Sequence, residues 1–295
     1  LGLLFKVATI WRDEADQPQK AVRHLEAALA LDAESLHAAV ELIGLYRSLG
    51  DWRKLPPVYD VAIQKTIDAA ERKRLMLEAA EVHEVNLGNA ERAFFLYLDA
   101  FKENLLDDDL RMQAERLAGP SRNWDIYVAV LEQAAPLLPD DERKVATWLR
   151  VGEIRSIELD EGEEAQAAFQ KALALDPGNR AAVFALDALY RRMERWGELV
   201  DVLRRRLDLE RRTEERKPLR FDIAQILYAH LGRTDEAIAV YEDILAEETV
   251  EIRAYTALGE LLLAERRFEE LRRLLSREVE AMYGSPEGTP DVLAD

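Results

Sequence analysis

Small and apolar residues recur along the chain at a fixed interval of 72 residues. The interval is clearest at an alanine position and at an aromatic position, each seen four times: Ala21, Ala93, Ala165 and Ala237, and Trp52, Trp124, Trp196 and Phe268. Within each interval the apolar positions lie three and four residues apart, which is the period of an α-helix and not of a strand. The pattern therefore predicts repeated amphipathic helices, and we expect the aromatic rings to wedge between consecutive helical units.

Each 72-residue interval holds two helical hairpins. One position near the start of each second helix recurs at alternating steps of 34 and 38 residues: Ala21, Leu55, Ala93, Tyr127, Ala165, Leu199, Ala237 and Leu271. The four additional residues equal about one helical turn, so we expect longer helices and not an added loop. Helices often end at a residue with positive φ, and Gly50, Gly88 and Gly232 stand where first helices end.

The predicted fold is all-α, a right-handed α-solenoid of about eight hairpins. The hairpins occupy residues 1–283 as one superhelical array, and residues 284–295 form a tail or the start of a further repeat.

The turns and second helices carry a resemblance to the tetratricopeptide repeat family. The segments Leu87–Tyr97, Glu163–Pro177 and Leu231–Tyr241 look like the turn and second helix of that family, and the 34-residue step equals its repeat length. The resemblance implies a bacterial-type array of paired 34- and 38-residue hairpins. It also implies a concave groove lined by the first helices, in which a protein or peptide partner binds.

By this resemblance, polar positions of the first helices would face the groove. These candidate partner-binding residues are Arg47, Arg116, Arg191, Arg192, Glu81, Glu84 and Tyr228. They vary between hairpins, as a surface that recognises a partner would, although a merely solvated face also varies. Because guanidinium groups bind carboxylates with two hydrogen bonds, we expect Arg191 and Arg192, near Arg47 and Arg116 in their register positions, to bind an acidic side chain or a C-terminal carboxylate of the partner.

Composition narrows the functional classes. There are 58 acidic and 40 basic residues, and the formal net charge of −18 argues against a nucleic-acid partner. No apolar stretch approaches the 18 residues of a membrane span, so no membrane insertion is expected. Cysteine is absent, which excludes disulfides and thiolate sites. A cytoplasmic location is favoured, with the periplasm as an alternative.

No motif predicts catalysis, a metal or a cofactor. The four histidines are not spaced as a helical metal-binding pair, and phosphate-binding loops and nucleophile motifs are absent from the sequence. His83 stands where the other repeats have Trp11, Arg155 and Leu227, so we interpret it as a histidine packed between helices.

Two functions are compatible with these patterns. The first is a non-enzymatic scaffold for protein–protein interaction, and the alternative is a regulatory or oligomerisation arm of a larger multidomain enzyme. The chain begins with Leu1 and not with Met, and Leu3, Phe5 and Ala8 fill core positions without a polar helix before them. Because terminal repeats normally need a polar outer face, we expect a fragment that continues or self-associates through uncapped repeat ends.

Overall fold

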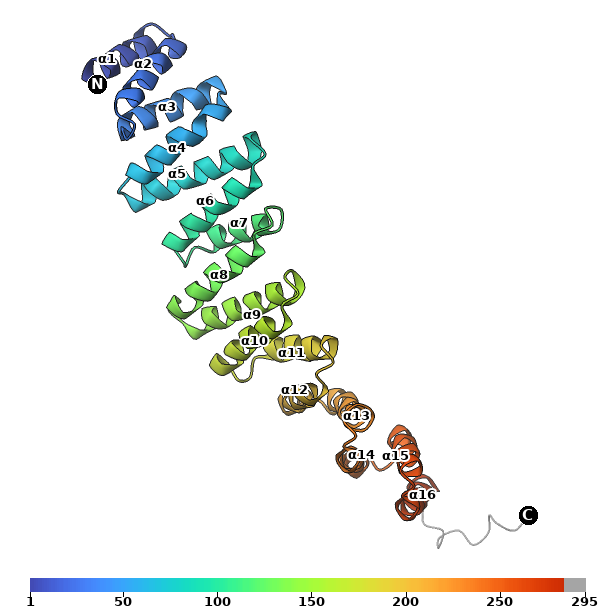
Figure 1. Cartoon of the computed structure of the whole chain (residues 1–295). Helices are drawn as coiled ribbons and strands as arrows, with labels where there is room; N and C mark the ends of the chain where they lie inside the picture. Colours follow the sequence, from blue (N-terminus) through green and yellow to red (C-terminus); the bar gives the residue numbers. More distant parts are fainter. Residues whose placement is uncertain (284–295) are drawn as a thin grey trace, which may run out of the picture. The chain divides into compact units, whose positions relative to one another are not determined.

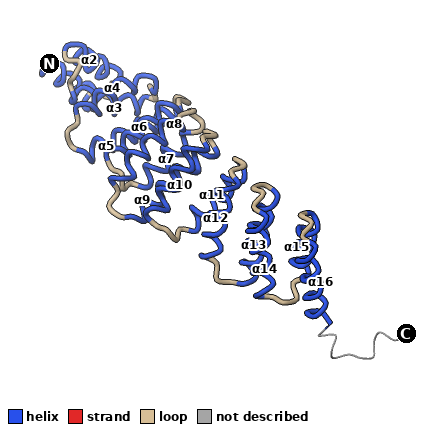
Figure 2. The backbone as a smooth tube through the Cα atoms, turned by 60° about the horizontal axis from the view of Figure 1, so that its bottom comes forward, coloured by secondary structure: helices blue, strands red, loops and turns tan. Residues whose placement is uncertain are grey.

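All regular elements of residues 1–283, the part described by the computed structural model, are helical (Figures 1 and 2). Sixteen α-helices within this part form eight consecutive hairpins, α1–α2 to α15–α16. Sequential helices pack against each other, as α3 does on α4 and α13 on α14. The predicted all-α array of eight hairpins is confirmed, while the right-handed superhelix stays a prediction.

Contacts divide the chain into two compact units, Leu1–Thr147 and Trp148–Asp295, with the boundary inside α9. The first unit contains α1 (Gly2–Thr9), α2 (Pro18–Leu31), α3 (Leu36–Leu49), α4 (Leu55–Lys65), α5 (Ala69–Glu81), α6 (Ala90–Glu103), α7 (Asp108–Ala118) and α8 (Trp124–Ala134). After α9 (Asp141–Ile157), the second unit contains α10 (Gly162–Leu175), α11 (Arg180–Arg192), α12 (Trp196–Leu209), α13 (Thr213–Ala229), α14 (Thr234–Glu247), α15 (Ile252–Ala264) and α16 (Phe268–Tyr283). A single superhelical array over 1–283 stays a prediction, and the predicted tail 284–295 lies outside the described residues.

The longer step of the repeat lengthens helices, as predicted. Helices α9 and α13 have 17 residues each, whereas α11 has 13. The turns of these longer hairpins also contain one additional residue. It is accommodated by a backbone hydrogen bond of the π-helical type, from an amide to the carbonyl five residues earlier. The bond from Leu87 to Val82 measures 3.1 Å, and it recurs at the equivalent pairs 15 to 10, 159 to 154 and 231 to 226. In two hairpins this turn forms short π-helical segments, η1 (Ile10–Glu14) and η3 (Val82–Asn86).

The aromatic position at the start of second helices bridges hairpins at Trp196. Its ring stacks on His230, which follows α13 of the next hairpin, with ring centroids 3.9 Å apart and planes at 18°. The predicted wedge is therefore confirmed at this position. Because the ring is only half-buried, it lies at the edge of the interface between the two hairpins and not in its centre.

A residue with positive φ follows the first helix of every hairpin. Glycine fills this place three times, at Gly50, Gly88 and Gly232, as predicted. The other five hairpins place a side chain there, at the same two register positions: Asp16, Arg122, Asp160, Glu194 and Arg266. A residue with a Cβ atom pays about 1–2 kcal/mol in this conformation. The turn geometry is thus imposed by helix packing, and glycine only relieves its strain.

Replacing Glu194, whose φ is 55°, by glycine should therefore stabilise the protein. We expect a gain of up to about 1 kcal/mol, because the steric relief exceeds the entropy that glycine adds to the unfolded chain. The measurement is the free energy of unfolding in urea. Glu194→Ala is the matched control, since it removes the same side chain and keeps the Cβ atom. An equal gain in both variants would show that the backbone is not strained.

Candidate functional site

The predicted site residues lie on first helices or at their ends. Arg47 lies on α3, Glu81 on α5, Glu84 on η3, Arg116 on α7, Arg191 and Arg192 on α11, and Tyr228 on α13. We call the face formed by these positions within each unit the first-helix surface. Most of the charged side chains on this surface are bound to other groups of the same or a neighbouring hairpin, as the following contacts show.

The structure joins two of the predicted residues directly. Arg116 donates to both carboxylate oxygens of Glu84, at 2.6 Å and 2.8 Å, and so links α7 to the hairpin before it. The hydrogen bonds from Arg116 hold the pKa of Glu84 below its ordinary range. Both residues therefore remain ionised and paired near neutral pH.

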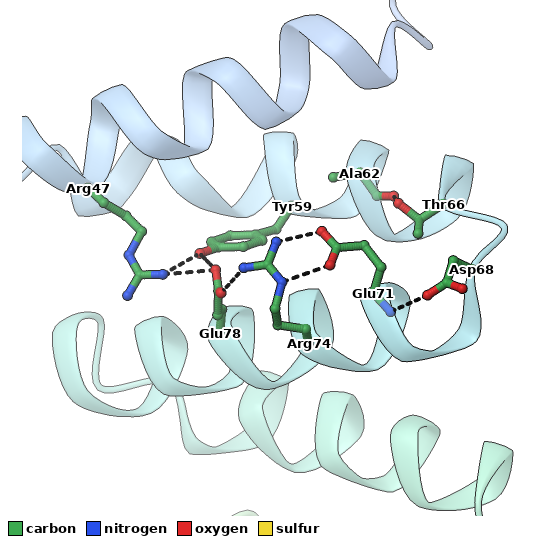
Figure 3. Close-up of polar contacts among 8 residues, drawn as sticks. All are labelled: Arg47, Tyr59, Ala62, Thr66, Asp68, Glu71, Arg74 and Glu78. Atoms are coloured by element: carbon green, nitrogen blue, oxygen red, sulfur yellow. Dashed lines mark hydrogen bonds and ion pairs between the residues drawn. The ribbon is translucent and has the colours of Figure 1, made fainter.

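Arg47 belongs to a network that crosses from α3 to α4 and α5 (Figure 3). Its guanidinium donates to Glu78 Oε2 at 2.8 Å, and the Tyr59 hydroxyl donates to the same oxygen at 3.1 Å. Arg74 binds the other oxygen of Glu78 and, at 2.9 Å and 2.5 Å, the carboxylate of Glu71. Burial, reinforced by the charge of Glu78, raises the pKa of Tyr59 to about 12, so its hydroxyl stays a donor.

Arg191 is tied to a buried carboxylate that the sequence reasoning missed. Asp187 on α11 is 6% exposed. One of its oxygens accepts from Arg191 at 2.7 Å, and the other accepts from Arg206 of α12 at 2.7 Å. Arg191 also donates to Asp222 of α13 at 3.0 Å. The four-residue spacing of Asp187 and Arg191 on one helix was the signal that could have identified the pair.

Arg192 differs from the other three candidate arginines. It donates to the Ser156 carbonyl at 2.8 Å and to the Ser156 hydroxyl at 3.0 Å. The ion pair it forms, with the exposed Asp160, spans 4.0 Å, beyond hydrogen-bond distance. Its charge is therefore less neutralised than that of Arg47, Arg116 or Arg191.

The two remaining predicted residues have no polar partner within residues 1–283. Glu81 is exposed and Tyr228 is half-buried. Tyr228 occupies the register position of Arg12, Glu84 and Ser156, each of which is hydrogen-bonded to the next first helix. This link is absent at Tyr228 among the described residues.

A cleft of about 490 Å³ opens on the first-helix surface of the first two hairpins. Its lining combines apolar and polar groups from η1, the following turn, the start of α2, and α3: Arg12, Asp16, Pro18, Val40, Glu41, Gly44, Leu45 and Ser48. A methyl group added at Gly44 would meet no atom within 4 Å. The equivalent residue two hairpins later is Arg116, so the cleft exists partly because Gly44 lacks a side chain.

Exposed apolar residues recur beside this surface, and the sequence reasoning missed them. Val40, Met112 and Phe184 are 41%, 52% and 41% exposed, at positions 72 residues apart on α3, α7 and α11. The 72-residue spacing of these three apolar residues was the signal in the sequence that could have identified them.

His83 is buried between helices, which confirms its predicted packing role. Its Nδ1 atom has no hydrogen-bond partner. Burial, together with the nearby charge of Arg92, lowers the pKa of His83 below its ordinary value.

Across residues 1–283, no group of three or more His, Asp or Glu side chains could hold a metal ion. None of the described helices has the length and apolar character needed to cross a membrane.

Comparisons with known proteins agree with the hairpin pattern. Residues 182–217, which cover α12 and most of α11, match the family model described as tetratricopeptide repeat. No curated protein matches the chain.

Among similar solved structures is Naa15/Naa10 bound to HypK-THB, with 16% identity, a TM-score of 0.44 and coverage of 96% of this chain. The match spans only 42% of that protein's chain. The C-terminal part of a TPR repeat-containing protein from Cytophaga hutchinsonii has 14% identity, a TM-score of 0.39 and coverage of 86% of this chain and 99% of that one. YrrB, described as a TPR protein with an unusual peptide-binding site, has 17% identity, a TM-score of 0.34 and coverage of 63% and 92%.

The fold defines a helical-repeat protein, in which one two-helix unit recurs in a constant register. The sixth hairpin matches the tetratricopeptide repeat model directly, and the 72-residue register relates the other hairpins to it.

The two neighbouring arginines of α11 should respond differently to charge reversal. Arg191→Glu places a second carboxylate beside the buried Asp187, and we expect it to lower the free energy of unfolding by about 3 kcal/mol. Arg192→Glu should change it by less than about 0.5 kcal/mol, because Arg192 is exposed and holds no carboxylate closely. Urea unfolding followed by circular dichroism measures both. Equal losses would contradict the assigned contacts.

His83 should make the protein less stable in mild acid. Its folded pKa lies below the unfolded value of about 6.5, so as pH falls below that value the unfolded chain takes up the proton first and stability decreases. We expect His83→Leu and His83→Gln to lose less melting temperature than the wild type between pH 7.5 and pH 5, values that bracket the histidine range. An unchanged pH dependence in both variants would exclude His83 as its cause.

Proposed function

We propose that the chain is a protein-interaction scaffold whose first-helix surface binds a segment of a partner protein. The proposal involves binding and no catalytic step. The observation that carries it is the cleft between η1 and α3, which is open at Gly44 and bordered by the exposed Val40. Concave sites that combine apolar walls with a few polar groups are the usual form of a recognition site, and the lining of this cleft holds both kinds of group.

The contacts around the cleft indicate what enters it. Val40, Gly44 and Leu45 offer an apolar wall, while Arg12 and Glu41 are already paired with each other at the rim. Because this ion pair satisfies both charges, an apolar side chain of the partner gains more from the cleft than a charged one does. The partner segment, extended or helical, therefore inserts an apolar residue here.

The second unit offers a separate surface on α11. Phe184 is exposed on this helix, and the charge of Arg192 on the same helix is only weakly neutralised, by Asp160 at 4.0 Å. An acidic side chain or a C-terminal carboxylate of the partner binds Arg192, since it displaces only the contacts to Ser156. At Arg47, Arg116 and Arg191, an incoming carboxylate would have to displace one that the chain itself supplies.

A substitution that fills the cleft tests the proposal. Random peptides displayed on phage are selected against the whole protein, and their affinity is measured by fluorescence anisotropy. Gly44→Arg introduces the side chain found at Arg116, and we expect it to weaken binding at least about tenfold, which corresponds to 1.4 kcal/mol, without changing the melting temperature. Its matched control is Gly197→Arg on α12, where an added methyl group also meets no atom within 4 Å.

The outcomes separate the proposal from a charge effect. Loss of binding in Gly44→Arg alone supports the cleft, whereas equal loss in both variants reflects only the added positive charge. Failure to select any peptide that Gly44→Arg weakens would refute the proposed function.

A further inference from the structure

A second cleft, of about 310 Å³, lies on the second helices of the sixth and seventh hairpins, inside the second unit. Helices α12 and α14 form its walls, and the buried Ile223 of α13 lies between them. The lining residues are Arg204, Leu207, Arg220, Ile223, Glu236, Ala239, Val240 and Asp243. Pockets that hold small ligands span roughly 300–1,000 Å³, so this cleft has room for one large side chain.

Two other hairpins carry an aromatic ring at a lining position of this cleft. In the third hairpin, Phe95 of α6 holds the register position of Ala239 and is half-buried. In the fifth hairpin, Trp148 of α9 holds the register position of Arg220 and is 7% exposed. The seventh hairpin has an aromatic ring at neither position. The cleft is therefore open where other hairpins supply a ring of their own.

The missing ring leaves apolar side chains of the cleft partly exposed. Leu207 and Val240 are half-buried, whereas their equivalents Ala135 and Leu96 are at most 5% exposed. A side chain that covered Leu207 and Val240 would remove this apolar surface from water, which is favourable.

The charged groups around the cleft leave one carboxylate unpaired. Arg220 donates to both carboxylate oxygens of Glu247, at 2.5 Å and 2.6 Å. Arg204 donates to Glu236 at 3.0 Å. Asp243 is exposed and forms no ion pair within residues 1–283. A cation of a partner therefore binds Asp243 without displacing a cation of the chain itself.

The fifth hairpin shows which groups complete the equivalent place. Lys171 holds the register position of Asp243, and Trp148 holds that of Arg220. The Nζ atom of Lys171 lies 4.0 Å from the centroid of the Trp148 ring. The fifth hairpin thus supplies both a ring and a cation, whereas the seventh supplies an arginine and a free carboxylate.

The arginine of the cleft favours an aromatic side chain over an aliphatic one. The side chain of Arg220 is 12% exposed, and its two hydrogen bonds to Glu247 hold the guanidinium in one orientation. Elsewhere in this chain, the guanidinium of Arg206 lies 4.1 Å from the ring centroid of Phe184. A ring that stacks on Arg220 in the same way gains cation–π attraction in addition to the apolar contact.

We propose that the cleft between α12 and α14 binds an aromatic side chain of a partner protein that has a lysine or arginine next to it in sequence. The ring takes the place that Phe95 and Trp148 take in other hairpins, and the cation pairs with Asp243. The net charge of −18 favours the approach of such a basic segment. This inference goes beyond the proposed function, since it concerns the second helices and not the first-helix surface.

Titration of the blocked peptide acetyl-Gly-Phe-Lys-Gly-amide into the whole isotope-labelled protein, followed by NMR, tests the proposal. We expect saturable shifts of the backbone amide signals of Val240 and its neighbours on α14. Peptides with Leu in place of Phe, or with Glu in place of Lys, should each bind at least about threefold more weakly, because they lose the stacking or the ion pair.

Two variants act on the two halves of the site. Ala239→Phe introduces the ring that the third hairpin has at Phe95, and it should weaken binding at least about tenfold by filling the cleft, without lowering the melting temperature. Asp243→Asn should weaken the lysine peptide about threefold and leave a peptide with Gln in place of Lys unaffected. The matched control is Ala167→Phe at the equivalent exposed position of α10, and it should bind like the wild type.

Several outcomes would overturn the proposal. These are the absence of saturable shifts at the solubility limit of the peptide, unchanged binding of the lysine peptide to Asp243→Asn, and equal effects of Ala239→Phe and Ala167→Phe. Loss of binding in Gly44→Arg would place the peptide on the first-helix surface and would overturn the proposal as well.

Discussion

The fold depends on a close approach between the two helices of a hairpin, which is clearest in the third, fifth and seventh hairpins. The first helix offers a small residue, such as Ala80 or Ala224, and the second helix offers the fully buried Ala93 or Ala237. At Gly152 the space is so limited that an added methyl group would lie 2.4 Å from the ring of Phe169. Because interiors pack without voids, this contact fixes the separation of the helices and the direction of every side chain around them.

The turn between the helices is set by the packing of the two helices. Once the helices are held together, the connecting residue must adopt positive φ, and it does so at Asp16 and Arg266 as well as at Gly50. Local preference is therefore overruled by burial in five of the eight hairpins. The π-type bond at the longer turns has the same origin, since it accommodates an additional residue without moving the second helix.

A constant backbone register allows side chains at one position to change role. The position of Gly44 opens a cleft, whereas the same position at Arg116 forms an ion pair with Glu84. The cleft thus arises where a side chain that other repeats supply at this position is missing.

The sequence by itself determined the fold class, the eight hairpins and the core. These follow from the spacing of small and apolar residues, and that spacing reflects local helical geometry and contacts between neighbouring hairpins. The sequence also placed the candidate site residues on first helices, from Arg47 to Tyr228.

Only the tertiary structure decided how those residues are used. It paired Arg116 with Glu84 and Arg191 with Asp187, and it left Arg192 without a close carboxylate. It also revealed the cleft at Gly44. These features depend on distances between side chains of different helices, and the identity of a residue at a repeat position does not specify which neighbour its long side chain will reach.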